Sequence, residues 1–130
     1  MILLDTHVVV WLTIEPRRLP KSMGTLVAEA RMRNSGVGIS DFTLWELAML
    51  TTSGQIKPAI PLGVYLRRVE EMFLLFPITG PIAERSMQFT ENYPKDPADR
   101  LIGATALVHG VPLVTKDKGI VQSGEVNCVW

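Results

Sequence analysis

Four acidic residues stand where the chain could bring them to one edge of a folded domain. Asp5 follows the apolar run ILL, and Asp117 comes shortly after the apolar run PLVT. Asp99 lies at the start of the segment ADRLIGATALVHG, and Glu46 is embedded in the apolar segment FTLWELAML. A cluster of these carboxylates would repel itself unless a hard cation such as Mg²⁺ or Mn²⁺ neutralised it. Such a cation can activate water for attack on a phosphodiester.

Each of these acids except Glu46 also has a simple structural interpretation. Asp5 is suited to cap a helix, Asp99 to stabilise a helix N-terminus, and Asp117 to form a turn. For these three residues the structural and chemical interpretations both stay open. The neighbouring acids Asp41 and Asp96 fit the first turn of a helix and a turn before proline, so we expect them to be structural.

Glu46 is harder to explain by structure alone. It is the only charged residue between Asp41 and Lys57, in a segment that is apolar on nearly every side of a helix. Such a helix is predicted to be buried, and Trp45 is expected to lie in the core with it, as is Trp11 on an earlier helix. A buried carboxylate must be protonated, paired or bound to a cation.

Other chemistries find little support in the sequence. The two histidines, His7 and His109, and the single cysteine, Cys128, disfavour a zinc site and exclude an internal disulfide framework. No glycine-rich phosphate loop is present. Basic side chains flank the proposed site and could hold RNA phosphates, although they could equally be ordinary solvated charges: Arg100, Lys116 and Lys118.

Short apolar runs alternate with helical patterns along the chain. The runs predict strands at 2–4, 37–40, 73–78, 111–115 and 127–130, and the patterns predict helices near 6–15, 20–34, 41–53, 62–72, 80–89 and 98–109. The expected stop of the second helix is Asn34-Ser35-Gly36, and residues 116–120 are expected to form a turn or short helix. This alternation predicts an α/β fold with a mostly parallel sheet, whose active site lies beyond the carboxyl ends of the strands.

Length and composition are those of one ordinary domain spanning residues 1–130. Hydrophobic residues make up 47% of the chain, and 13 basic residues balance 13 acidic ones, so no overall basic surface for nucleic acid is indicated. No apolar run is long enough to span a membrane, and the N-terminus lacks the basic region of a signal peptide. With only one cysteine, a cytoplasmic location is expected.

Three segments together resemble the PIN domain, and more closely the VapC-type toxins of bacterial toxin–antitoxin pairs. These segments are LLDTHVVVWL, ISDFTLWELAML and DPADRLIGATALVHGVPLVTKD, and with the sequence between them they cover nearly the whole chain in order. The resemblance implies a three-layer α/β/α sandwich. It also implies a Mg²⁺- or Mn²⁺-dependent endoribonuclease that is often a homodimer and is inhibited by a small antitoxin protein.

The resemblance also assigns roles to individual residues. The acidic quartet of the family maps onto Asp5, Glu46, Asp99 and Asp117, as catalytic and metal-binding residues. Polar positions that commonly support these acids match Thr6, Ser40 and Thr115. Within the last segment, Gly103 and Ala104 are expected to let their helix pack closely on the sheet.

Three alternatives remain at this stage. A haloacid dehalogenase-type hydrolase also begins with a strand followed by Asp, but it expects a second Asp where this chain has His7. A receiver-type signalling domain expects paired acids after its first strand, and only Asp5 is present. A catalytically inactive PIN-like binding module is the third. Self-association and antitoxin binding are expected to use apolar surface that includes Met72, Phe73, Phe76 and Trp130.

Overall fold

A five-stranded parallel sheet forms the centre of the protein. The computed structural model describes residues 1–33 and 35–130. The strand order is β3-β2-β1-β4-β5, and every neighbouring pair is parallel. The strands are β1 (Ile2–Leu4), β2 (Val37–Ser40), β3 (Leu74–Phe76), β4 (Leu113–Val114) and β5 (Cys128–Val129). From β1 the chain builds outward through β2 to β3, then returns to add β4 and β5 on the other side. The topological switch point therefore lies between β1 and β4.

Helices connect the strands, as the alternating pattern predicts. They are α1 (Thr6–Thr13), the short 3₁₀ helix η1 (Pro16–Arg18), α2 (Lys21–Met32), α3 (Asp41–Thr52), α4 (Leu62–Met72), α5 (Gly80–Ser86), α6 (Pro97–His109) and α7 (Lys118–Ser123). The predicted stop at Asn34 lies outside the described residues. In the described part of the chain, no helix has both the length and the apolar character needed to cross a bilayer.

The structure corrects the predicted end of one helix and confirms the predicted end of another. The fifth helix ends at Ser86 and not near residue 89, and Phe89 beyond it stacks on Tyr93 with ring centroids 3.8 Å apart. Gly110 ends α6 as predicted, in the left-handed conformation (φ 63°) that a residue without a Cβ adopts at little cost.

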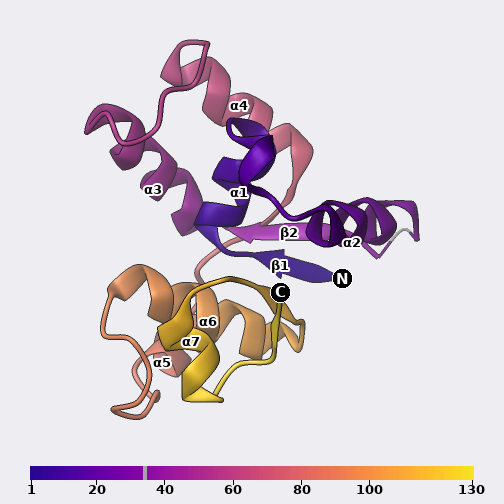
Figure 1. The fold of residues 1–130 in the computed structure, drawn as a ribbon. Helices are drawn as coiled ribbons and strands as arrows, with labels where there is room; N and C mark the ends of the chain where they lie inside the picture. Colours follow the sequence, from indigo (N-terminus) through magenta and orange to yellow (C-terminus); the bar gives the residue numbers. More distant parts are fainter. Residues whose placement is uncertain (34) are drawn as a thin grey trace.

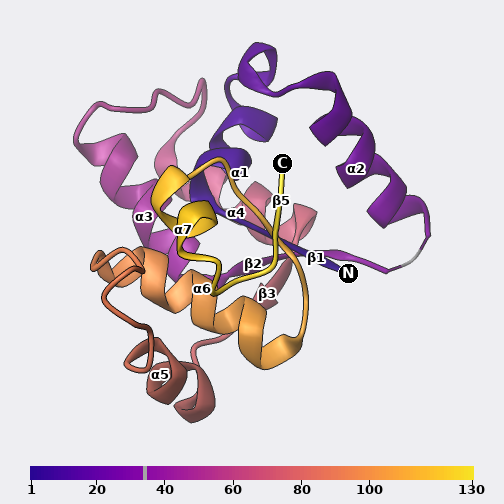
Figure 2. The same cartoon turned by 60° about the horizontal axis from the view of Figure 1, so that its bottom comes forward.

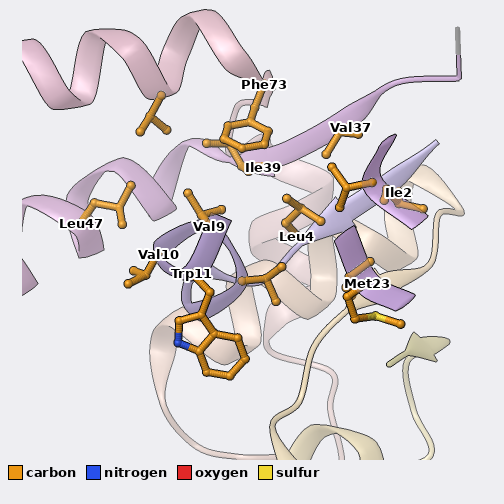
Figure 3. Packing of buried hydrophobic residues seen from close by; sticks show 14 of the residues in the cluster. Ile2, Leu4, Val9, Val10, Trp11, Met23, Val37, Ile39, Leu47 and Phe73 are labelled. Atoms are coloured by element: carbon orange, nitrogen blue, oxygen red, sulfur yellow. The ribbon is translucent and has the colours of Figure 1, made fainter. Parts of the chain in front are cut away.

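The helices cover both faces of the sheet and confirm the three-layer α/β/α sandwich. Helices α1, α3 and α4 lie on one side of β1 and β2, and α5, α6 and α7 lie on the other (Figure 1). Helix α2 belongs to the first side, because its residues Met23 and Val27 pack in the same core as α1, α3 and α4. Alternating side chains of β1 divide between the two cores: Leu4 packs with Ile39 and Leu47 in one (Figure 3), whereas Leu3 packs with Ile102 in the other. Both faces of β1 are thus buried, which explains its continuous apolar sequence.

Helix α3 is less buried than the sequence suggests. Only Thr43 and Leu47 are fully buried on it, while Trp45 is 58% exposed and Met49 is also exposed. The prediction that Trp45 belongs to the core is therefore wrong, whereas Trp11 is buried as expected. The physical reason is position: α3 is packed by its neighbours along one side, and its apolar outer face is left to solvent.

The apolar surface expected to serve interfaces also differs in part. Phe73 packs in the core of the α1–α4 side and Phe76 is half-buried, so neither offers much surface. Met72 and Trp130 are exposed, as expected. Trp130 ends the chain against α1, where its ring lies 5.7 Å from the ring of Trp11; Figure 2 shows the path of this last segment.

Gly103 makes room for an aromatic side chain and not for the sheet. A Cβ at this position would overlap the hydroxyl of Tyr93 and lie 3.1 Å from Phe89. The close helix–sheet approach predicted for Gly103 is therefore wrong. Ala104, one residue further, is fully buried in the core on the α5–α7 side.

Candidate active site

The four acids selected from the sequence meet in one cavity. Asp5, Glu46, Asp99 and Asp117 all line a hollow of about 380 Å³, together with Thr6, His7, Trp11, Glu15, Arg18, Gln55 and several apolar residues. Asp5 follows β1 and Asp117 lies three residues beyond β4, so the cavity opens at the carboxyl edge of the sheet, at its topological switch point. The expectation that separate segments deliver carboxylates to one edge is confirmed.

Asp5 is the most buried of the four acids. It is the N-cap of α1, and its Oδ1 accepts a hydrogen bond from the backbone N–H of Thr6 at 2.8 Å. Its Oδ2 accepts from the hydroxyl of buried Thr115 at 2.7 Å. Both oxygens are thus oriented by the protein, and each keeps a further lone pair for a ligand. The capping and chemical interpretations of Asp5 are therefore compatible.

Glu46 reaches the cavity from α3 and is oriented by two threonines. The Thr6 hydroxyl donates to Glu46 Oε1 at 2.5 Å and lies 3.0 Å from the Thr43 hydroxyl. Because the Thr6 hydroxyl has a single proton, Thr43 must be the donor to it, which gives a relay from Thr43 through Thr6 to Glu46. Burial, and to a lesser extent the nearby charge of Asp5, raises the pKa of Glu46 to about 7.

Asp99 does not cap helix α6, because Asp96 does so. Asp96 is the N-cap of α6, and its carboxylate accepts from the backbone N–H of Ala98 at 2.8 Å and of Asp99 at 3.3 Å. The carboxylate of Asp99 instead lines the cavity, while its carbonyl accepts a hydrogen bond from Tyr93 at 2.6 Å. Burial and the charges of Asp5 and Asp117 raise the pKa of Asp99 to about 7.

Asp117 is linked to Asp5 through a shared threonine. Its backbone N–H donates to the Thr115 hydroxyl at 3.0 Å, and that hydroxyl in turn donates to Asp5. The carboxylate of Asp117 caps α7 by accepting from the N–H of Ile120 at 3.0 Å. The expected turn or short helix after residue 115 is therefore a helix.

The supporting roles of the predicted polar residues differ. Thr6 and Thr115 contact the acids directly, as described above. Ser40 supports Glu46 indirectly. It caps α3 by accepting a hydrogen bond from the N–H of Phe42 at 3.1 Å, and so stabilises the helix that carries Glu46.

His7 is part of the cavity, a role that the sequence analysis did not assign to it. Its Nε2 accepts a hydrogen bond from the backbone N–H of Lys116 at 3.0 Å, so the ring proton is on Nδ1, which faces Asp5 Oδ2 at 3.6 Å. Burial lowers the pKa of His7, which favours this neutral form. The signal for it was its position two residues after Asp5, within the first turn of α1.

The basic side chain that lines the cavity is not one of the three that the sequence analysis selected. Arg18, at the end of η1, lies on the cavity wall and bonds to Glu15 Oε2 at 3.1 Å. Lys116 and Lys118 are exposed beside Asp117, whereas Arg100 donates to the carbonyl of Pro94 at 3.3 Å. Arg18 could not be found from spacing because an irregular segment, and not a regular helix, brings it to the cavity.

Within residues 1–33 and 35–130, no three His, Cys, Asp or Glu side chains are grouped tightly enough to hold a metal ion by themselves. The acids of the cavity nevertheless offer carboxylate oxygens as ligands. Burial raises the pKa of Asp99 and of Glu46, so their ionised forms are unfavourable there without a cation. Mg²⁺ typically takes one or two carboxylates and completes its shell with water and substrate phosphate. The donor chemistry therefore fits a hard divalent cation.

The fold and the cavity define an α/β protein with an acidic site at the switch point of a parallel sheet. Residues 2–125 match the PIN domain family. The chain is 36% identical over 117 residues to Ribonuclease VapC22 of Mycobacterium tuberculosis, covering 90% of this chain and 87% of that protein. The protein therefore belongs to the PIN domain family, which confirms the resemblance noted in the sequence.

Solved structures share the fold over the full length. VapBC2 from Rickettsia felis, in a crystal structure bound to a DNA fragment from its promoter, matches with a TM-score of 0.76 at 17% identity, covering 100% of this chain and 99% of that one. VapBC-1 from nontypeable Haemophilus influenzae matches with a TM-score of 0.70 at 18% identity, covering 99% and 97%. FitAcB from Neisseria gonorrhoeae matches with a TM-score of 0.66 at 24% identity, covering 100% and 97%.

Proposed function

We propose that this protein is a metal-dependent endoribonuclease and the toxin of a VapBC-type toxin–antitoxin pair. The observation that carries the proposal is the meeting of four carboxylates from distant segments in one cavity at the sheet edge. The relative of 36% identity that is named a ribonuclease supports RNA as the substrate.

We assign the divalent cation, Mg²⁺ or Mn²⁺, to the oxygens of Asp5 and Asp99, with Glu46 and Asp117 completing the acidic wall. When bound, the cation supplies an activated water and neutralises charge on the phosphodiester. Thr115 and the N–H of Thr6 hold the Asp5 carboxylate in place for this role. The Asp96 cap and the Tyr93 hydroxyl fix the start of α6, and with it Asp99.

Glu46 is suited to handle the proton of the attacking water. Its pKa of about 7 lies near physiological pH, where a general base is most effective. Thr6 occupies Oε1, which orients the carboxyl group and leaves Oε2 to accept a proton.

The partners follow from the same assignment. The solved structures that share the fold include a toxin–antitoxin complex from Klebsiella pneumoniae, which supports a small antitoxin as the cognate partner. Exposed apolar side chains around β3, namely Met72 and Leu74, support self-association as a homodimer. We place this activity in the cytoplasm, in keeping with the single cysteine of the chain.

The test is cleavage of RNA by the purified protein free of antitoxin. Mg²⁺ or Mn²⁺ should support cleavage, EDTA should stop it, and the products should carry 5′-phosphate and 3′-hydroxyl ends. Asp99→Asn should abolish cleavage, whereas Asp96→Asn should retain it, because asparagine also caps helices well. Cleavage that survives EDTA would contradict the metal assignment, and a protein that binds RNA without cleaving it would be an inactive binding module.

A further inference from the structure

An aromatic cluster lies against the cavity wall on the side of α1. Trp11 contacts His7 edge-on at 5.1 Å between ring centroids and Trp130 at 5.7 Å, and His7 lies 6.3 Å from Trp130. Trp11 and His7 line the cavity, but Trp11 is only 8% exposed. Trp130 is 39% exposed, which makes it the most exposed member of the cluster.

Two cations surround the same cluster. The guanidinium carbon of Arg18 lies 4.9 Å from the centre of the Trp11 ring, and the Lys116 ammonium lies 5.8 Å from it. Arg18 also lines the cavity, and Lys116 is anchored to His7 through its backbone N–H. Positive charge and an exposed tryptophan therefore lie together beside a strongly acidic cavity.

The acids of the cavity would repel the phosphates of an RNA strand, and the neighbouring cations and aromatic rings could offset this repulsion. Five acids line the cavity, including Glu15, so an RNA strand approaching it needs attractive contacts nearby. Single-stranded nucleic acid is commonly held by cations that contact its phosphates and aromatic rings on which its bases stack. Such stacking does not depend on the base, because every base has a π-face.

We propose that Trp130 is the stacking platform of a subsite for single-stranded RNA, which takes a base next to the cleaved phosphate, while Arg18 and Lys116 contact neighbouring phosphates. Trp11 and His7 contact the Trp130 ring and hold it in position. The proposal rests on the proposed ribonuclease function, since it assigns the position of a substrate base relative to that site.

The experiment measures binding of a fluorescently labelled eight-nucleotide single-stranded RNA to the full chain in EDTA at low salt, where cleavage does not interfere. Trp130→Ala should weaken binding about 5- to 20-fold, and Trp130→Phe less. Trp45→Ala is the matched control, because Trp45 is also exposed but lies on the outer face of α3, stacked on Phe42. It should bind like the unaltered protein.

A second probe separates stacking from mere structural support. An oligonucleotide of the same length and charge without bases should bind the Trp130→Ala variant and the unaltered protein equally. Lys116→Ala should reduce the slope of log Kd against log salt by about 0.7, as expected for one phosphate contact on a single strand, and Trp130→Ala should leave the slope unchanged.

The outcomes distinguish this subsite from the proposed function. If the unaltered protein cleaves RNA but Trp130→Ala binds the RNA as tightly as Trp45→Ala does, the subsite is refuted and the ribonuclease stands. If the protein never cleaves RNA but loses binding to the base-containing probe alone on Trp130→Ala, the platform stands and the ribonuclease is refuted. Equal loss of binding for both probes would assign Trp130 a structural role and overturn the proposal.

Discussion

Asp99→Asn separates a metal ligand from a helix-stabilising acid. Asparagine preserves the size of the side chain, and Asp96 keeps the cap of α6 in either case. In the unaltered protein without metal, the pKa of Asp99 rises from 3.8 to about 7 through burial and the neighbouring charges of Asp5 and Asp117. Ionised Asp99 therefore destabilises the metal-free fold, and the substitution should relieve that cost.

The magnitude follows from the pKa. A rise from 3.8 to about 7 corresponds to about 4 kcal/mol against the ionised form. Because Asp99 is only partly buried, solvent screening reduces this to about 1–2 kcal/mol. Because the pKa of Asp99 is higher in the folded than in the unfolded protein, the protein keeps its full stability below the unfolded pKa. It loses stability as the pH rises from the unfolded pKa to the folded pKa. The variant should therefore gain its full advantage at pH 8, about 3–8 °C in Tm, and little near pH 4.

Metal binding should respond in the opposite direction. A ligand at 100 times its Kd stabilises a protein by about 2.7 kcal/mol, and Asp99→Asn should lose most of the corresponding Tm increase on adding Mn²⁺. RNA cleavage should fall by orders of magnitude. The assay is a set of thermal melts at pH 8 with and without Mn²⁺, with Asp96→Asn as the control that keeps its Mn²⁺ response. A variant that melts lower without metal, yet keeps its Mn²⁺ response and activity, would refute the reasoning and return Asp99 to the role of a helix-stabilising acid.

Three further substitutions test the surroundings of the site. Glu46→Gln should stabilise the metal-free protein more at pH 8 than at pH 5, since its pKa of about 7 makes the ionised form costly at high pH; urea melts at both pH values check this. Thr115→Val should cost about 1–3 kcal/mol in a urea melt by leaving buried partners without a hydrogen bond, and Thr115→Ser should be nearly neutral. Gly103→Ala should destabilise by about 1–3 kcal/mol because the new Cβ collides with Tyr93, whereas Gly24→Ala, with space around it on α2, should be neutral or stabilising in the same thermal melt.

Much of the fold could be predicted because its signals are local. Short apolar strands, helix caps and the glycine stop at Gly110 each depend on a few consecutive residues. The rule that parallel strands point their carboxyl ends to one edge then placed Asp5, Asp99 and Asp117 together without any knowledge of distances. Glu46 was found by a different argument, the cost of a carboxylate in an apolar segment.

The errors and omissions arise where tertiary packing decides. Trp45 belongs to a helix that is apolar all round, and the sequence does not state which of its sides the fold covers. Arg18 reaches the cavity through a short 3₁₀ segment that has no periodicity to interpret. The contact between Trp11 and Trp130 joins residues near opposite ends of the chain, so no window of sequence contains it.

A helix-capping role and a place in the cavity are combined in Asp5 and Asp117, and they are separated only at the start of α6. Asp5 and Asp117 cap helices and line the cavity at once, so the hydrogen bonds that begin α1 and α7 also aim the carboxylates. Replacing either acid therefore perturbs fold and site together. At the mouth of α6 the two tasks are divided, with the cap on Asp96 and the cavity wall on Asp99. For this reason the pair Asp96→Asn and Asp99→Asn can measure capping and metal binding separately, which no substitution at Asp5 or Asp117 can do.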